Sequence, residues 1–362
     1  MKNILLIAPT GRNGGISSWA NKLLNCFASG DFHFISIDSA LKHRLETQMS
    51  PFKRIYAGLL DLKDIKKSVK TTIRNNKIDI MHITTSGSFA TLRDYVLGRM
   101  CRKNGMKMIM HCHYGNMPEF LNSKGIFKHI LLYTMGMYDE IWVLDSKTEN
   151  LLKKYTKLSR KVYLIPNGID VPHSFDNTPK TFNKIAFIGN VIPSKGVFEL
   201  IKAVLKIERD VILYIVGPAD EESKDRIKAM CNDQLGTKIQ ILGKMDNRDA
   251  VSFMKKVDIL ALPTYYKFEA FPISILEAMS NGKLVISTNR AAIPNMLTAQ
   301  DGSMCGILVE EKNVDAIQNA IEFCIDHPEE CNKTCEKAYQ KVRESYRLDV
   351  VYKMIEDRYK NL

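Results

Sequence analysis

The sequence predicts an α/β protein with two doubly wound domains, each built on a parallel sheet that is covered by helices on both faces. Apolar strand-like runs alternate with helical stretches along almost all of the 362 residues, and a segment without periodicity divides them into two series. The length suits two domains of ordinary size. With 45% hydrophobic and 25% charged residues, the composition excludes a fibrous repeat or a wholly disordered chain.

The first series begins with Asn3–Ala8, a continuous apolar run that predicts a buried strand. A glycine-rich loop follows it, and helical spacing then extends over Ser17–Phe27. The other strands expected in this series are Phe32–Ile37, Ile78–Ile83, Lys107–His111, Glu140–Leu144 and Val162–Ile165. Helices are expected between them, at Leu59–Arg74, Ala90–Lys103 and Thr148–Tyr155. Residues 1–170 therefore form the predicted N-terminal domain.

The second series starts after Val171–Asn183, a stretch rich in Pro, Asn, Ser and Thr that we interpret as a linker. Its expected strands are Lys184–Ile188, Ile212–Val216, Lys238–Leu242, Ile259–Leu262, Leu284–Ser287 and Gly306–Val309. Residues 171–345 form the predicted C-terminal domain, and Tyr346–Asn361 is expected to be a helix. Ligands of open parallel sheets bind beyond the carboxyl ends of the strands, so two such domains would share one central cleft.

Charge is distributed unevenly between the two predicted domains. Residues 1–170 contain 26 Lys+Arg and 13 Asp+Glu, a net charge of +13, whereas residues 171–362 contain 26 and 27, a net charge of −1. This asymmetry indicates an anionic partner for the first domain, which could be nucleic acid, a membrane surface or a phosphorylated substrate.

Nothing in the sequence indicates secretion or a membrane span. No stretch reaches the roughly 18 uncharged apolar residues of a spanning helix, and the apolar N-terminal run is too short for a signal peptide. The eight cysteines include no Cys-x-x-Cys pair, and scattered thiols fit a reducing compartment. We therefore expect a cytoplasmic protein whose thiols are inert.

The most informative motif spans Glu269–Gly282, with the letters EAFPISILEAMSNG, and follows a predicted strand that ends at Leu262. Pro272 suits the first turn of a helix, where its missing N–H costs nothing. Asn281-Gly282 suits the end of that helix. The motif therefore predicts a helix that opens at the carboxyl end of a strand.

The start of this helix is a candidate anion site. The N–H groups of Phe271, Ile273 and Ser274 would point into the space beyond the strand, where they could bind a phosphate. Two glutamates flank them, and ionised carboxylates accept hydrogen bonds from hydroxyl groups. From spacing alone, an ordinary capped helix on the surface, with Glu269 and Glu277 in solvent, is an equal alternative.

The Glu-x7-Glu pattern of this motif resembles the signature of the family 4 retaining glycosyltransferases. Other segments resemble that family in the same order, and these are Gly14-Gly15, His113, Ile165–Asp170, Phe187–Gly196, Ile215–Gly217, Ile241–Gly243 and Asp258–Pro263. The resemblance covers nearly the whole chain and is most specific in the C-terminal domain. It implies the GT-B architecture, in which two Rossmann-like domains face a central cleft and residues 346–362 form a helix that crosses back to the N-terminal domain.

The resemblance implies a role for each matching residue. Glu277 would bind the ribose hydroxyls of a nucleotide, and Glu269 would contact the donor sugar. Lys195 would neutralise the leaving phosphate, and His113 would contact the sugar near the reacting carbon, so His113, Lys195 and Glu269 are the expected catalytic residues. The remaining expected donor contacts are Gly14, Gly15, Gly189, Asn190, Gly243, Met245, Phe271, Pro272, Ile273 and Ser274.

One departure from the family concerns the charge beside the leaving phosphate. The family usually has Arg where this chain has Asn190, which lacks the full charge and the bidentate fork of a guanidinium group. Lys267 and Arg12 are candidates for the missing cation. The departure bears on donor affinity and rate, and it leaves the expected reaction class unchanged.

The implied function is a retaining transfer of sugar from a nucleotide-diphosphate sugar, with UDP as the expected nucleotide, to a glycan or lipid-linked acceptor. Capsule, O-antigen and exopolysaccharide assembly use such steps. N–H groups and Lys195 would stabilise the negative charge that develops on the leaving oxygen. Metal-dependent glycosyltransferase folds use an Asp-x-Asp motif, which this sequence lacks, so we expect neither a metal nor another cofactor. His111 and His113 provide too few ligands for a catalytic zinc site, and we interpret His111 as structural.

Two other classes of function are weaker alternatives. A GT-B nucleotide-sugar 2-epimerase is expected to lack the Glu-x7-Glu arrangement. A nucleic-acid-binding protein is suggested by charge alone, and the sequence has no helix-turn-helix, RRM or zinc-finger pattern, so we expect no nucleic-acid partner.

The basic character of the first domain suggests a membrane partner. Lys63–Arg74 is rich in lysine, and Phe120–Met137 mixes lysine with large apolar residues. Basic amphipathic helices suit anionic lipid surfaces, although solvated helix faces are the commoner case. We expect a peripheral contact between the N-terminal domain and the inner face of the cell membrane.

Overall fold

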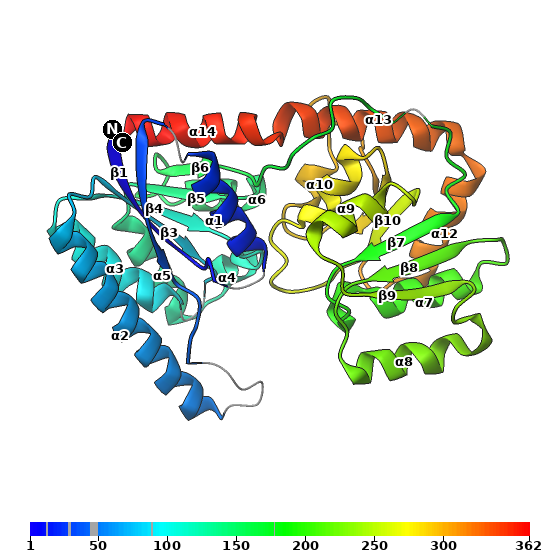
Figure 1. The fold of residues 1–362 in the computed structure, drawn as a ribbon, viewed down its shortest axis with the longest axis horizontal. Helices are drawn as coiled ribbons and strands as arrows, with labels where there is room; N and C mark the ends of the chain where they lie inside the picture. Colours follow the sequence, from blue (N-terminus) through cyan, green and yellow to red (C-terminus); the bar gives the residue numbers. More distant parts are fainter. Residues whose placement is uncertain (12–13, 28–29, 44–49, 88–89, 177) are drawn as a thin grey trace. The chain divides into compact units, whose positions relative to one another are not determined.

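The computed structural model describes residues 1–11, 14–27, 30–43, 50–87, 90–176 and 178–362. They form two compact units. The first unit comprises Met1–Ile165 with Tyr352–Leu362, and the second comprises Pro166–Val351. Each unit is a parallel six-stranded sheet flanked by helices (Figure 1). The prediction of two doubly wound α/β domains is confirmed.

The sheet of the first unit has the strand order β2-β1-β3-β4-β5-β6, and all its pairs are parallel. Its strands are β1 (Lys2–Ala8), β2 (Phe32–Asp38), β3 (Ile80–Thr85), β4 (Lys107–Cys112), β5 (Glu140–Val143) and β6 (Val162–Leu164). Its helices are α1 (Gly15–Cys26), α2 (Pro51–Asn75), α3 (Ala90–Lys103), α4 (Met117–Asn122), α5 (Ile126–Gly136), α6 (Ser146–Lys153) and the end of α14 (Leu348–Asn361). The strand order reverses direction at β1, which is where ligands bind in such sheets.

The two faces of this sheet are covered by different helices. Right-handed crossovers place α1 on one face and α2, α3, α5 and α6 on the other, and α14 shares the face of α1 (Figure 1). Strand side chains alternate accordingly. Met81 and Ile83 of β3 join the hydrophobic core beneath α2, α3 and α5. His82, between them, points to the opposite face, where its ring packs against Tyr359 of α14.

The sheet of the second unit has the order β12-β11-β10-β7-β8-β9 and is also parallel throughout. Its strands are β7 (Lys184–Ile188), β8 (Ile212–Val216), β9 (Ile239–Gly243), β10 (Ile259–Leu262), β11 (Leu284–Thr288) and β12 (Ile307–Val309). Its helical elements are η1 (Pro193–Lys195), α7 (Val197–Lys206), α8 (Glu221–Cys231), η2 (Asn232–Gln234), α9 (Asn247–Met254), α10 (Ile273–Ser280), α11 (Ile293–Met296), α12 (Val314–Asp326), α13 (Pro328–Ser345) and the start of α14.

Four of the five predicted helices differ from their predicted bounds: α1 and α6 by one or two residues at each end, and α2 and α14 mainly at their starts. Helix α2 begins at Pro51 rather than at Leu59, because Ser50 caps its N-terminus by accepting a hydrogen bond from the N–H of Lys53 and proline suits the first turn. The C-terminal helix begins at Leu348 rather than at Tyr346, since the carbonyl group of Tyr346 accepts a hydrogen bond from the N–H of Ile169 instead of continuing a helix.

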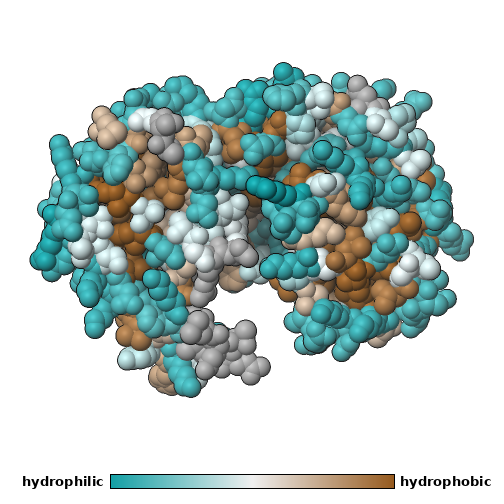
Figure 2. Space-filling view, viewed as in Figure 1, coloured by the Kyte–Doolittle hydropathy of each residue, from teal (hydrophilic) through white to brown (hydrophobic). Residues whose placement is uncertain are grey.

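The face in view in Figure 2 is largely hydrophilic, with hydrophobic areas between the hydrophilic ones. Within the described ranges, no helix combines the length and the apolar character that crossing a membrane requires.

Candidate functional site

The two glutamates of the motif are both buried. Glu269, in the loop before α10, is 7% exposed, and Glu277, within α10, is 9% exposed. Pro272 caps α10, and Asn281 ends it ahead of Gly282, which has a φ of +66°. The alternative of two solvent-exposed glutamates is therefore wrong. Because a buried carboxylate is costly unless it is paired, each glutamate should have partners.

The partner of Glu269 is Lys195. Its Nζ donates to Oε2 of Glu269 in an ion pair whose two side chains are 14% and 8% exposed, respectively. Nζ also lies 5.3 Å from the centre of the Tyr266 ring, a cation–π distance. Lys195 ends η1, the short turn that follows β7, so this pair joins the ends of two neighbouring strands, β7 and β10.

Thr264 contacts the same carboxylate oxygen. Its Oγ1 lies 3.3 Å from Oε2 of Glu269 and 3.4 Å from the carbonyl oxygen of Ser194, and it accepts a hydrogen bond of 3.2 Å from the N–H of Tyr266. The N–H of Tyr265 donates to the carbonyl oxygen of Ser194 at 2.8 Å. The loop after β10 is thereby tied to the turn that carries Lys195.

Glu277 is held by a different side chain. Nδ2 of Asn247, on α9, donates to Oε1 of Glu277 at 2.8 Å. Asn247, Thr264 and Tyr266 were not among the residues predicted from the motif. Thr264 and Tyr266 lie just after a predicted strand end, which is a usable signal, but Asn247 carries none that a single sequence shows.

Glycines bring the strand ends of this sheet together. A Cβ on Gly217, after β8, would lie 1.8 Å from the carbonyl oxygen of Gly189, and one on Gly196 would lie 2.1 Å from that of Pro263. The N–H of Gly217 donates to the carbonyl oxygen of Gly243 at 2.8 Å. Gly196 and Gly243 also have φ angles of +77° and +73°, which favour glycine. The predicted glycines Gly189 and Gly243 thus both lie beside Gly217, at the carboxyl ends of the strands.

The N-terminus of α10 lies at the same carboxyl end of the sheet. The N–H of Ile275 makes the first hydrogen bond of the helix, to the carbonyl oxygen of Pro272 at 3.1 Å. The N–H groups of Ile273 and Ser274 precede that bond and are available to an anion. Phe271 is buried, with its ring 5.7 Å from that of Tyr346.

The other predicted donor contacts lie in loops that follow the carboxyl ends of the strands. Asn190 is exposed in the loop after β7, and Met245 is half-buried after β9. Lys267, a candidate to replace the missing arginine, is exposed in the loop before Glu269. Arg12, the other candidate, lies outside the described residues. Within the described ranges, no group of three or more His, Cys, Asp and Glu side chains could hold a metal ion.

The predicted residues of the first unit also lie together. Gly14 precedes α1 and Gly15 begins it, and a Cβ on either would meet no atom within 4 Å. His113 follows β4, where its N–H donates to the carbonyl oxygen of Thr85 at 2.8 Å. Trp19 of α1 connects the two regions, because its ring centre lies 5.0 Å from that of His113.

Three histidines form a buried cluster beneath α1. The ring of His111 lies 4.1 Å from that of His113 and 5.6 Å from that of His82. Nδ1 of His82 lies 2.6 Å from the Tyr359 hydroxyl. Burial lowers the pKa of His82 and of His113 to about 3, and it lowers the pKa of His111 well below its usual value. All three imidazoles are therefore neutral at physiological pH.

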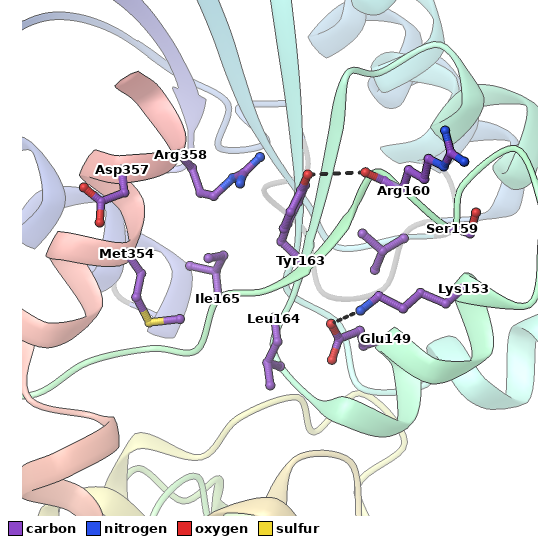
Figure 3. A pocket seen from close by; sticks show the side chains of 11 residues that line it. Glu149, Lys153, Ser159, Arg160, Tyr163, Leu164, Ile165, Met354, Asp357 and Arg358 are labelled. Carbon is purple, nitrogen blue, oxygen red and sulfur yellow. Dashed lines mark hydrogen bonds and ion pairs between the residues drawn. The ribbon is translucent and has the colours of Figure 1, made fainter. Parts of the chain in front are cut away.

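A separate hollow of about 690 Å³ lies along the edge strand β6 of the first unit (Figure 3). Its charged side chains are largely paired: Lys153 donates to Glu149 at 2.7 Å, and Arg358 pairs with the buried Glu140 while its guanidinium carbon lies 3.6 Å from the centre of the Tyr163 ring. The contacts of Arg358 fasten α14 to the sheet, and none of the predicted site residues lines the hollow.

Known proteins resemble this chain in sequence. Residues 172–341 match the family described as glycosyl transferases group 1. An uncharacterized glycosyltransferase of Methanocaldococcus jannaschii is 24% identical over 89% of this chain and 87% of its own length. The phosphatidyl-myo-inositol mannosyltransferase of Mycolicibacterium smegmatis is 30% identical over 43% of this chain and 41% of its own length. The matched domain and the named relatives identify a glycosyltransferase.

Solved structures share the fold over the whole chain. Sucrose-phosphate synthase from Thermosynechococcus elongatus has a TM-score of 0.78 at 16% identity and covers 100% of this chain and 99% of its own. HepE from Anabaena, solved in complex with UDP-glucose, has a TM-score of 0.74 at 15% identity and covers 100% of both chains. These likenesses support the expected GT-B fold.

Proposed function

We propose that this protein is a retaining, metal-independent glycosyltransferase that moves a sugar from a UDP-sugar to a glycan or lipid-linked acceptor. One observation carries the proposal: two buried carboxylates, Glu269 and Glu277, flank the open N-terminus of α10. This arrangement suits a diphosphate that has hydroxyl-bearing groups on both sides, which describes a nucleotide-sugar.

In this proposal the diphosphate lies at the N–H groups of Ile273 and Ser274. Glu277 accepts hydrogen bonds from the ribose, and Glu269 accepts them from the sugar. Lys195 forms an ion pair with Glu269, which contacts the sugar in this proposal. Lys195 is therefore positioned to neutralise charge on the leaving phosphate as the glycosidic bond breaks. Such preorganised charge stabilisation is usually the largest contribution to catalysis.

His113 and Gly14-Gly15 are the residues of the first unit that we propose to contact the donor. A neutral imidazole can donate or accept a single hydrogen bond, so His113 suits contact with a sugar hydroxyl. Gly14 and Gly15 leave open space at the start of α1, where a phosphate could approach the backbone.

The choice of UDP and of the acceptor class rests on related proteins. HepE was solved with UDP-glucose, and the mycobacterial relative is named for mannose transfer to phosphatidyl-myo-inositol. A lipid-linked acceptor also fits the net charge of +13 in residues 1–170. The products would belong to capsule, O-antigen or exopolysaccharide assembly.

The proposal is tested by thermal shift and slow hydrolysis with UDP-, GDP- and ADP-sugars. A bound donor raises Tm by an amount that grows with the logarithm of its concentration over its Kd, and the largest shift at equal concentration is expected for a UDP-sugar. Retention is tested by NMR of the sugar released from an α-linked donor, which should first appear as the α-anomer. A protein that neither binds nor hydrolyses any of these donors would overturn the proposal.

A further inference from the structure

Exposed large hydrophobic side chains gather on three helices of the first unit, α2, α3 and α5. We call the following nine the apolar helix face: Phe52, Ile55, Tyr56, Leu59, Leu92, Ile126, Phe127, Ile130 and Tyr133. In the second unit, the described side chains of this kind are Leu242, Phe268, Met304 and Phe323, which lie on separate elements. Single exposed hydrophobic residues are ordinary, but nine on neighbouring helices of one layer are typical of an interaction surface.

Helix α2 contributes a regular stripe. Phe52, Ile55, Tyr56 and Leu59 follow the i, i+3, i+4, i+7 spacing that places side chains on one side of a helix. They are 85%, 52%, 65% and 51% exposed, whereas the nearby Ala57 is buried. An amphipathic helix normally turns such a stripe toward a core, so here the stripe faces outward and is available to a partner.

Helix α5 also exposes large apolar side chains. Ile126, Phe127, Ile130 and Tyr133 are exposed, while Leu131 between them is buried in the core of the first unit. The sequence from Phe120 to Tyr138 contains Lys124 and Lys128 and no acidic residue. Lys124, just before α5, is exposed, whereas Lys128 is half-buried with its Nζ 5.9 Å from the centre of the Tyr155 ring, so the outward side of α5 is mainly apolar.

The three helices belong to one continuous layer. They cover the same face of the sheet, and α3 packs between α2 and α5 (Figure 1). The rings of Tyr95 on α3 and Tyr133 on α5 lie 6.2 Å apart, and Arg99 donates to the Tyr95 hydroxyl at 3.1 Å. Each helix begins at the carboxyl end of the sheet, the same end at which His113 lies.

The charge around the apolar helix face is positive. Helix α2 carries Lys53, Arg54, Lys63, Lys66, Lys67, Lys70 and Arg74. Two acidic side chains on these helices are turned inward, since Asp61 and Asp94 are 4% and 1% exposed, and Asp94 pairs with Arg93 at 2.8 Å. Asp64 is the exposed exception on α2, and it lies 3.8 Å from His43.

We propose that the apolar helix face docks onto the surface of an anionic lipid bilayer. The inference deepens the proposed function, because it rests on a lipid-linked acceptor that must be reached at the carboxyl end of the first sheet. Apolar side chains would enter the interface while lysines contact lipid headgroups. A second copy of the chain fits less well, because a symmetric contact would bring two faces of the same positive charge together.

The test is cosedimentation of the full-length protein with vesicles of phosphatidylcholine alone or with 30% phosphatidylglycerol. Binding is expected with the anionic vesicles and should weaken as salt is raised, since each surface lysine contributes about a fivefold factor that salt screens. The combined F127S/I130S variant and the K66E/K67E variant should each lower the vesicle-bound fraction at least tenfold.

Matched controls come from the second unit. F323S removes an exposed aromatic ring, and K255E/K256E reverses an adjacent pair of exposed lysines, and all three residues belong to the second unit. Both controls should bind vesicles as the unmodified protein does. Circular dichroism of every variant distinguishes a lost contact from a lost fold.

Three results would overturn the inference: no vesicle binding by the unmodified protein, undiminished binding by F127S/I130S, or a dimer in analytical ultracentrifugation that this variant dissociates. Hydrolysis of a UDP-sugar without vesicles separates this inference from the proposed function. F127S/I130S should hydrolyse donor at the normal rate. Vesicle binding without any donor hydrolysis would support the docking surface and contradict the proposed function.

Discussion

Lys195 and Glu269, 74 residues apart in the sequence, form a buried ion pair at the carboxyl ends of β7 and β10. Thr264 and Tyr266 surround the pair, so its geometry is set before any substrate arrives. In the proposed function, a positive charge that already lies at the leaving phosphate needs no rearrangement during reaction.

Removing either member of this pair should abolish transfer. Lys195→Ala removes the cation that stabilises the leaving group, and a loss of one hundredfold or more in rate is expected. It also leaves the Glu269 carboxylate buried without a countercharge, which should lower the free energy of unfolding by about 3 kcal/mol. Glu269→Gln keeps the shape and should lose transfer with less destabilisation.

Transfer rates and urea denaturation measure both effects. The control is Lys206→Ala, which removes an exposed pair of 2.7 Å with Asp315 whose side chains are 54% and 73% exposed. That change should lower the free energy of unfolding by less than about 1 kcal/mol and leave the transfer rate unchanged. A normal rate in Lys195→Ala would contradict the assignment of Lys195.

Glu277 should discriminate between nucleotides by their ribose hydroxyls. Glu277→Gln replaces a charged acceptor with a neutral amide, and UDP binding measured by calorimetry should weaken about tenfold. Binding of 2′,3′-dideoxy-UDP should be equally weak in the variant and the unmodified protein, because that ligand lacks the hydroxyls. Asn247→Ala, which removes the 2.8 Å hydrogen bond to Glu277, should show a smaller effect of the same kind. Equal losses for both nucleotides would place Glu277 away from the ribose.

Gly196 should tolerate no side chain. It has a φ of +77°, and a Cβ would lie 2.1 Å from the carbonyl oxygen of Pro263. Gly236 is a matched control, because its φ is +89° and no atom lies within 4 Å of its Cβ position. Gly236→Ala should cost about 1 kcal/mol of stability, from the backbone angle alone.

Gly196→Ala should cost clearly more, and it should also lose transfer, because the neighbouring Lys195 would shift. Urea denaturation compares the two variants directly. If both lost the same stability, the close approach of Gly196 to Pro263 would not constrain the site.

The buried histidines should make the protein sensitive to acid. The folded pKa of His82 and of His113 is about 3, below the unfolded value near 6.5, so between these limits the unfolded chain binds more protons. Stability is fully present above about pH 6.5 and falls as pH decreases, by about 1.4 kcal/mol per pH unit for each such histidine. Urea denaturation from pH 7 to pH 5 measures this slope.

His82→Asn should lower the pH dependence of the free energy of unfolding by the contribution of one proton, about 1.4 kcal/mol per pH unit, since the neutral amide does not titrate. His33→Asn serves as the control because His33 is exposed on β2, and its slope should match that of the unmodified protein. A His82→Asn slope equal to the unmodified one would show that His82 is protonated in the folded state.

The local sequence pattern was sufficient to predict the strands and the helix of the Glu269–Gly282 motif. Continuous apolar runs such as Asn3–Ala8 bury strands in any doubly wound sheet, and the structure has strands in all twelve predicted places. Pro272 and Asn281-Gly282 bounded α10 correctly because capping depends on residues that are adjacent in sequence. The start of α2 was missed because the prediction did not use the start signals Ser50 and Pro51, which precede a stretch that already has helical spacing.

The sequence by itself therefore determined the fold class, the positions of the strands and the helix start that could receive a phosphate. The tertiary structure decided whether Glu269 and Glu277 were buried, and it supplied Lys195, Thr264 and Asn247 as their partners. The physical reason is that burial and ion pairing depend on which strand ends meet across the sheet. That arrangement follows from the packing of the whole unit, which sequence spacing does not record.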